Sequence, residues 1–271
     1  IWAHIYEYLF FQYSTVSICL VIGVSILTFI FGTTSAWIMS FYDLPFKRLL
    51  SFLLIMPIAI PPYAVAYCYA DISDYSAKIQ NLEKFDYLTY FISLIPSVRS
   101  TFGAIFVLSL TLFPYVYLIC KNSFINNAKS ILEAAANLGA SRRTLFFKFA
   151  LPISRPAIAA AIALVTMETL ADFGVVHYLG VDSLSVGIYK AWFGFDDLNS
   201  SARIASILFT FSFLIIFLEK LSRKKNSQRY ISYGKTNNHN LFPKGSFLPG
   251  TFILLLISIS LIIPLSWLIT C

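Results

Sequence analysis

The sequence predicts an all-α membrane protein, a polytopic helical bundle of about six transmembrane helices. Of its 271 residues, 58% are hydrophobic and 12% are charged, about half the charged fraction of a soluble globular protein. The mean hydropathy of +0.75 agrees with this. Several apolar runs reach the roughly 20 residues that a helix needs to cross a bilayer. Because these runs are continuously apolar, they do not fit the alternating strands of a membrane β-barrel.

Six apolar runs predict the spans in chain order. They cover residues 14–40, 49–70, 101–120, 156–173, 202–218 and 247–271. Residues 1–13 are expected to lie outside the membrane. The second run contains Pro57, Pro61 and Pro62, which remove backbone donors and break helical continuity. This break is either a kink that shapes packing or a segment that lines a transport pathway.

Lys and Arg residues indicate the orientation of the chain. The segments after the first, third and fifth spans hold 15 of the 20 basic residues. Basic loops stay in the cytoplasm, so Ile1 is expected outside. The net charge of +7 then reflects topology and contact with anionic lipid. A nucleic-acid partner is not expected, because the sequence offers no soluble basic face with exposed aromatic residues.

The spans suggest a five-helix unit over 14–219, a cytoplasmic linker over 220–246 and a further span over 247–271. The chain opens with Ile1 and stops inside an apolar run, and we therefore expect a fragment. No signal peptide is visible. Four cysteines (Cys19, Cys68, Cys120 and Cys271) are widely spaced without a metal-binding pattern. They are expected to be buried free thiols.

The cytoplasmic segment 121–155 predicts a helix–turn–helix. Ser130 and Glu133 have the spacing of a capping box at a helix start, and Gly139 is a natural helix stop. A second helical stretch over 141–149 is expected to end at Leu151-Pro152. Taken alone, this pattern also fits an ordinary amphipathic connector.

The same segment resembles the EAA loop of ABC transporter permeases, whose pattern is E-A-A-x3-G-x9-I-x-L-P. Phe149 stands where that pattern usually has Ile. The resemblance implies a coupling loop that docks in a groove of a separate ATPase subunit. The residues that carry this role are Glu133, Ala134, Ala135, Gly139, Leu151 and Pro152.

Residues 167–178 and 187–193 resemble the iron(III)-type importer permeases, in which two halves are fused in one chain. This resemblance implies that the chain covers most of a first half, that a preceding span is missing, and that 247–271 begins a second half. The expected substrate is ferric iron, delivered by a periplasmic binding protein. Thiamine or another small solute is the alternative, because importers of thiamine and importers of anions share parts of these motifs.

Two carboxylates, Glu168 and Asp172, lie four residues apart within a predicted span. They are roughly 18 and 24 Å from its cytoplasmic start at 1.5 Å per residue. An ionisable group at this depth is a functional-site hypothesis, here a lining of the substrate pathway. The structural alternative is a pair with Arg203 or Lys190, or a capping role near Gly174.

His177 and Tyr178 follow the two acids and extend the candidate pathway, because hard oxygen ligands suit a ferric ion. The alternative is an aromatic belt at the membrane interface with a hydrated histidine. The three histidines (His4, His177 and His239) are too scattered to predict a metal cluster. No metal site, cofactor or catalytic residue is expected in this chain.

A transport subunit is the favoured function class. No G-x-x-x-x-G-K-[ST] phosphate loop occurs in the sequence. ATP is therefore expected to bind to a pair of partner ATPase subunits. A periplasmic binding protein is expected to dock on 71–99 and 181–201. An intramembrane hydrolase would need acids on facing helices, or a Ser and a His at membrane depth. An ion channel or secondary transporter would need no ATPase-docking loop. The expected location is the inner membrane.

Overall fold

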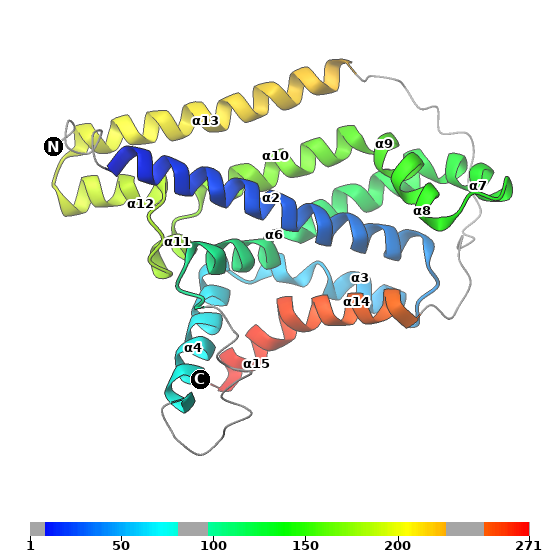
Figure 1. The fold of residues 1–271 in the computed structure, drawn as a ribbon, viewed down its shortest axis with the longest axis horizontal. Helices are drawn as coiled ribbons and strands as arrows, with labels where there is room; N and C mark the ends of the chain where they lie inside the picture. Colours follow the sequence, from blue (N-terminus) through cyan, green and yellow to red (C-terminus); the bar gives the residue numbers. More distant parts are fainter. Residues whose placement is uncertain (1–8, 81–96, 226–246, 271) are drawn as a thin grey trace.

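The computed structural model describes residues 9–80, 97–225 and 247–270, and every regular element within these ranges is helical. The elements are α2 (Phe10–Phe41), α3 (Lys47–Leu53), η2 (Met56–Ala59), α4 (Pro62–Gln80), α6 (Thr101–Ser123), η3 (Phe124–Ala128), α7 (Lys129–Asn137), α8 (Arg142–Thr144), η4 (Leu145–Ala150), α9 (Leu151–Ile153), α10 (Arg155–Ala171), α11 (Gly174–Tyr178), α12 (Leu184–Tyr189), η5 (Lys190–Gly194), α13 (Leu198–Lys225), α14 (Phe247–Ile257), η6 (Ser258–Ile262) and α15 (Ile263–Thr270). Figure 1 shows α2, α6, α10 and α13 running side by side, with α7 and α8 at one end and α11 and α12 at the other.

The predicted all-α bundle is confirmed. Within the described residues, four helical segments are long and apolar enough to cross a membrane, and two bent helix pairs raise the number to as many as six. The helix of the first span begins at Phe10 rather than at 14, and α13 continues to Lys225 rather than ending near 218. Both helices are longer than the apolar runs because backbone hydrogen bonding does not stop where the apolar residues stop.

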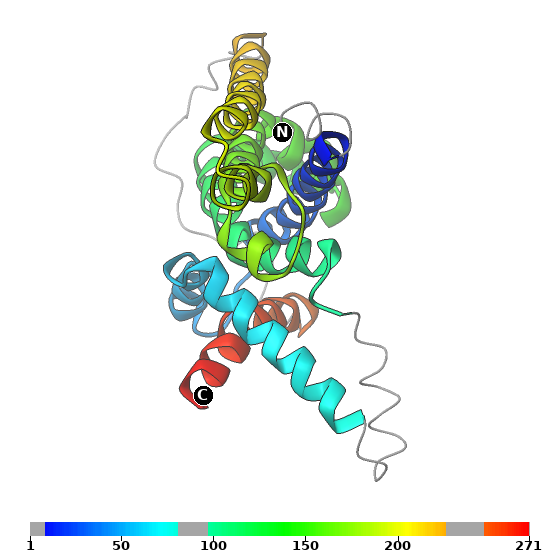
Figure 2. The same cartoon turned by 90° about the vertical axis from the view of Figure 1, so that its left-hand side faces the viewer.

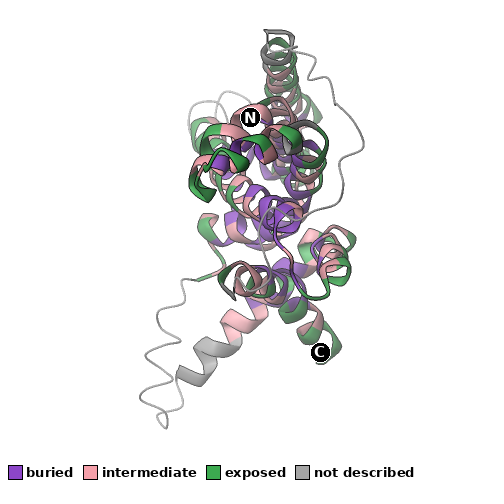
Figure 3. Cartoon of the chain, turned by 90° about the vertical axis from the view of Figure 1, so that its right-hand side faces the viewer, coloured by how far each residue is buried: buried purple, intermediate pink, exposed green. Residues whose placement is uncertain are grey.

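The centre of the bundle is α6, which packs along α2 at very close range. Two glycines of α2 permit this approach: a Cβ on Gly23 would lie 2.6 Å from Ile105 Cδ1, and one on Gly32 would lie 2.5 Å from Val116 Cβ. Small residues serve membrane helices in this way, since close backbones gain van der Waals contact that lipid cannot supply. Figure 3 shows the buried residues gathered along the middle of the bundle.

The second predicted span is broken, as its prolines indicate. Residues Lys47–Ala59 and Pro62–Asp74 form two helices bent by 92° at the break. Pro61 lies between them and Ile60 is extended. After the break α4 points away from the other long helices (Figure 2). The break thus directs α4 toward the last helical segment.

The segment α14–η6–α15 packs against α4 through polar contacts. Tyr69 Oη donates to the carbonyl of Ile259 at 2.5 Å, and Trp267 Nε1 donates to Asp71 Oδ2 at 2.8 Å. Pro264 lies five residues after Ile259 and has no N–H with which to close a π-helical bond. The Tyr69 hydroxyl therefore satisfies a carbonyl that the proline leaves without its helical donor.

The predicted state of the cysteines is partly wrong. Cys68 and Cys120 are buried thiols outside any disulfide, as expected, but the Cys19 thiol is exposed. Cys19 lies on the outer face of α2, beside the exposed Ile18 and Ile22. The fourth, Cys271, lies outside the described residues, as do the pre-helix residues 1–8 and most of the predicted linker.

Candidate functional site

The predicted helix–turn–helix has two arms, one before and one after the turn at Gly139. The first arm does not begin at Ser130. Helical structure is unbroken from α6 through η3 into α7, so helical residues precede Ser130 and the predicted capping box is wrong. No glycine or proline lies between Pro114 and Gly139. With nothing to end it, the helix of the third span continues directly into the loop.

The turn of the loop is centred on Gly139, where the predicted helix stop is confirmed. Gly139 has φ = +84°. Its N–H donates to the Ala136 carbonyl at 2.9 Å, and the Ala140 N–H donates to the Ala135 carbonyl at 3.1 Å. These two bonds are the Schellman pattern, which satisfies carbonyls at a helix end and favours glycine at the left-handed position. The geometry leaves Leu138, just before the glycine, with 90% of its surface exposed.

The second arm returns from the turn to the membrane. Ser141 caps α8 by accepting a hydrogen bond from the Thr144 N–H at 3.3 Å. The arm then runs through η4 and α9 to Ile153, so the predicted end at Leu151-Pro152 falls slightly early. The break lies at Ser154, where the arm and α10 meet at a bend of 71°. Ser154 is fully buried and accepts a hydrogen bond from Ser123 Oγ at 3.0 Å.

Aromatic side chains attach the loop to the end of α2. The Trp37 ring lies 5.2 Å from the Phe146 ring of the second arm and 6.1 Å from the ring of Phe124, which precedes the first arm. Arg142 lies 5.7 Å over the Tyr42 ring. Such aromatic pairs contribute about 0.5–1.5 kcal/mol each beyond their burial. The loop is therefore packed onto the bundle and does not hang free of it.

The residues of the EAA pattern divide between packing and exposure. Ala135 is buried, whereas Ala134 and Gly139 are exposed. Glu133, Leu151 and Pro152 are half-buried. Sequence reasoning missed the two most exposed apolar side chains of the loop, Leu138 and Phe147. A signal for Leu138 existed, since an apolar residue in a turn just before glycine has little intrachain packing available.

The two membrane carboxylates lie in different environments. Asp172 ends α10, and its Oδ1 accepts hydrogen bonds from the N–H groups of Val175 at 3.0 Å and Val176 at 3.4 Å. Asp172 thus caps α11, which is one of the structural roles that the sequence suggested. Glu168, one turn earlier in α10, is exposed. The structure places these two predicted pathway residues one helical turn apart, with Glu168 exposed and Asp172 half-buried.

Lys190, which the sequence suggested as one alternative partner for Glu168 and Asp172, pairs instead with Asp182. Lys190 Nζ lies 2.6 Å from Asp182 Oδ1, and this hydrogen bond raises the pKa of Lys190. Across the same end of the bundle, Arg99 lies 2.9 Å from Asp74 Oδ2, and this partner raises the pKa of Arg99. Lys190 and Arg99 are thus paired with neighbouring loop and helix acids near the C-terminal end of α10.

His177 and Tyr178 belong to two separate aromatic groups. The exposed His177 ring stacks on Phe173 with ring centres 4.7 Å apart and meets Tyr189 edge-on at 5.3 Å. The Tyr178 ring instead faces Tyr67 at 5.9 Å and lies 5.3 Å from the Arg99 guanidinium. Residues 9–80, 97–225 and 247–270 hold no group of three or more His, Cys, Asp or Glu placed to bind a metal ion.

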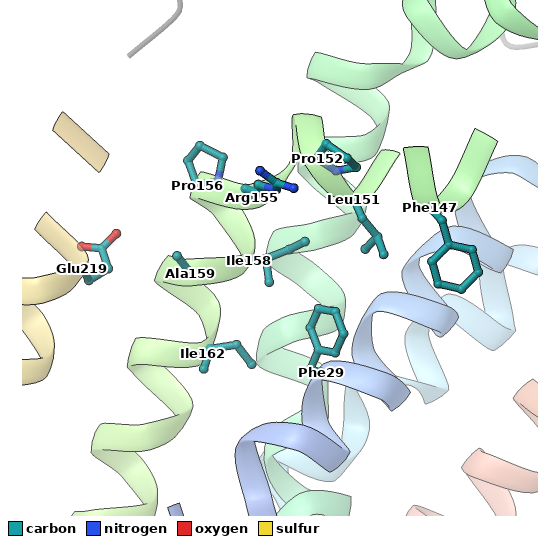
Figure 4. Close-up of a pocket in the computed structure, with 10 residues that line it drawn as sticks. All are labelled: Phe29, Phe147, Leu151, Pro152, Arg155, Pro156, Ile158, Ala159, Ile162 and Glu219. Carbon is teal, nitrogen blue, oxygen red and sulfur yellow. The ribbon is translucent and has the colours of Figure 1, made fainter. Parts of the chain in front are cut away.

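A cavity of about 700 Å³ opens beside the second arm. It lies between α2, α10 and α13, and η4 and α9 close one end (Figure 4). Most of its lining is apolar, with Phe29 and Ile162 among the side chains. Arg155 and Glu219 are the two charged residues that line it.

Comparison with known proteins gives a consistent picture. Residues 28–270 match the model of the family described as "Binding-protein-dependent transport system inner membrane component". The chain is similar to the sulfate transport system permease protein CysT of Escherichia coli, with 26% identity over 218 residues, 77% of this chain and 75% of that protein. It is also similar to the Fe(3+)-transport system permease protein FbpB 2 of Haemophilus influenzae, with 27% identity over 145 residues, 54% of this chain and 29% of that protein. A third relative is the inner membrane ABC transporter permease protein YcjO of Escherichia coli, 34% identical over 40% of this chain and 38% of its own length.

Proposed function

Because this chain belongs to the family of binding-protein-dependent transport system inner membrane components, we propose that it forms the substrate pathway of an ATP-driven importer and receives the motion of a separate ATPase at residues 133–152. The chain is a multi-pass inner-membrane permease subunit and not an enzyme. Importers of this family work with ATPase subunits and a soluble binding protein, and we assign both kinds of partner to this chain.

One observation carries the proposal for the loop: an exposed turn is joined by two packed arms to the bundle. Leu138 and Gly139 lie at the tip, and the arms lead back to α6 on one side and α10 on the other. A partner that moves the tip would act on both helices, and through Trp37 on α2 as well. Rocking of packed helices around a central site is the usual basis of alternating access.

We assign the pathway to the face of α10 that carries Glu168. Ala171 is also exposed on this face, and Ala157 and Ala160 are half-buried along it. Small side chains leave room beside the helix, and Glu168 is its one ionisable residue between Pro156 and Ala171. A charged group at this depth is costly unless it serves an ion pathway or faces water. Asp172, His177 and Tyr178 are assigned to the outer end of the same route.

Ferric iron is the proposed substrate, because a carboxylate in the pathway favours a cation and hard oxygen ligands suit ferric ion. Sulfate is the second candidate, since CysT is by name a sulfate permease. Thiamine, which is also cationic, would fit the same electrostatic argument. The acid at position 168 therefore favours the two cations, ferric iron and thiamine, over sulfate, and it does not separate the two cations from each other.

Uptake into vesicles that contain the complete transporter, with its binding protein supplied outside, tests this assignment. With ferric iron as substrate, Glu168→Gln should lower uptake at least tenfold and leave basal ATP hydrolysis unchanged. Asp172→Asn, at the outer end of the proposed route, keeps an oxygen acceptor for the α11 N–H groups and should lower uptake less than Glu168→Gln. Wild-type iron uptake by Glu168→Gln would contradict the pathway role. ATP-dependent uptake of sulfate but not iron would contradict the assignment of ferric iron as the substrate.

A further inference from the structure

The cavity between α2, α10 and α13 has the size and chemistry of a ligand site. Its volume of about 700 Å³ lies within the roughly 300–1,000 Å³ that small-molecule pockets occupy. Phe29 and Ile162 line it at the end away from the loop (Figure 4). An interior of this kind suits a hydrocarbon chain better than a polar solute, because it offers few hydrogen-bonding groups.

The charges of the cavity lie on two helices. Arg155 is the first residue of α10, next to Pro152 of the loop, and Glu219 enters from α13 (Figure 4). The start of α10 also carries the positive end of the helix dipole, which favours a phosphate there. One cation and one carboxylate at the same cavity match a ligand that carries both signs of charge.

We propose that this cavity binds a phosphatidylethanolamine molecule from the cytoplasmic leaflet. Arg155 holds the phosphate, because guanidinium groups bind phosphate oxygens with two parallel hydrogen bonds. Glu219 accepts a hydrogen bond from the ammonium group, and a carboxylate has room for several such donors. One acyl chain lies between Phe29 and Ile162. A purely anionic headgroup would meet Glu219, and a choline headgroup has no N–H to donate to it.

This lipid site is distinct from the proposed pathway. Arg155 and Ala159 precede Glu168 by 13 and 9 residues, so at 3.6 residues per turn they point roughly 140° and 180° away from it around α10. Ala159 lines the cavity and Glu168 does not. The lipid site therefore goes beyond the proposed function, and evidence for or against it does not depend on the route of the substrate.

Photo-crosslinking locates the lipid. The complete transporter is placed in nanodiscs with equal amounts of phosphatidylethanolamine, phosphatidylglycerol and phosphatidylcholine, and carries the photoreactive residue p-benzoylphenylalanine at position 162. The matched control carries it at position 26, where Ile26 is 53% exposed on the outer face of α2. Mass spectrometry of the adducts should show phosphatidylethanolamine enriched at position 162 over position 26 by about two- to fivefold, the range for one partly exposed ion pair.

Two charge variants test the headgroup assignment in the same nanodiscs. Glu219→Gln should abolish the enrichment of phosphatidylethanolamine over phosphatidylcholine, whereas Arg155→Gln should lower the adducts of all three phospholipids. Co-purification of the ATPase subunit verifies that each variant is assembled. Equal lipid composition at positions 162 and 26, an enrichment that Glu219→Gln leaves unchanged, or adducts to a protein chain at position 162 would each overturn the proposal.

Discussion

At Gly139 a single backbone angle shapes the proposed contact with the ATPase. Its φ of +84° is left-handed, and apart from Gly139 and its two chain neighbours no residue has an atom within 4 Å of the position that a Cβ would take. Space is therefore available for a side chain, and the requirement for glycine comes from the backbone alone. A left-handed conformation costs about 1–2 kcal/mol for residues other than glycine.

We predict that Gly139→Val impairs coupling without preventing membrane insertion. A β-branched residue disfavours the left-handed angle, so the turn should shift and substrate-stimulated ATP hydrolysis should fall several-fold. Gly139→Asn is the control, because asparagine tolerates this angle and should retain most of the activity. Stimulated hydrolysis in reconstituted vesicles measures both. Equal activity of the Val variant and the wild type would mean that the turn geometry does not matter for coupling.

At the scale of elements, the close packing of α2 on α6 holds the bundle together. A Cβ on Gly32 would lie 2.5 Å from Val116 Cβ and 3.0 Å from the Tyr117 backbone nitrogen. Neither atom is the flexible end of a side chain, so accommodation requires the helices to separate. Gly250 in α14 offers a contrast, because its Cβ would make an ordinary contact of 3.6 Å with Leu44 Cδ2.

Gly32→Ala should destabilise the protein by about 1–3 kcal/mol, the usual cost of overpacking. Gly250→Ala should be neutral or slightly stabilising, since alanine is the better residue within a helix. Thermal unfolding of the purified transporter in one detergent compares the two variants. A Gly32→Ala melting temperature at or above that of Gly250→Ala would show that α2 and α6 are not packed as closely as described.

The transmembrane spans were predictable from the length of the apolar runs, because the bilayer sets the length that a spanning helix needs, whatever helices pack beside it. The glycine stop at 139 and the proline break after 57 were predictable for a similar reason, since both act on the local backbone. The helix start at Ser130 was predicted wrongly, because a capping pattern cannot reveal that the preceding helix continues. The prediction that Cys19 is buried was also wrong, because an apolar run in a membrane protein does not indicate which face of the helix contacts lipid.

The candidate site was predictable in its motif and not in its contacts. The pattern from Glu133 to Pro152 indicated where the loop lies. Its anchoring by Trp37 depends on a helix about a hundred residues away, which no local pattern reports. The same holds for Asp172, whose capping bonds to α11 became visible only when the end of α10 was placed.

For the whole molecule, the basic segments predict which end faces the cytoplasm. Arg143 lies in the loop at one end of the bundle, and Asn199 lies at the start of α13, near α12 at the other end (Figure 1). Both are exposed. The charge distribution assigns Arg143 to the cytoplasm and Asn199 to the outside.

Single cysteines at these two positions test the orientation in a variant that lacks the four native cysteines. In intact cells, a membrane-impermeant maleimide should label Asn199→Cys and leave Arg143→Cys unlabelled. After the cells are broken open, both should react, which verifies that each thiol is accessible. Labelling of Arg143→Cys alone in intact cells would show that the whole bundle has the opposite orientation.

The central claim is that the turn at 138–139 touches a separate ATPase. Photo-crosslinking from p-benzoylphenylalanine at position 138 in the assembled transporter tests it most directly, because Leu138 is the most exposed large apolar side chain of the loop. The control carries the same photoreactive residue at position 193, in place of the exposed Phe193 of η5, which directly follows α12. Figure 1 shows α12 at the other end of the bundle from the loop. We expect an adduct with the ATP-hydrolysing chain from position 138 and none from position 193. Absence of that adduct at position 138, or an equal yield at both positions, would contradict the account.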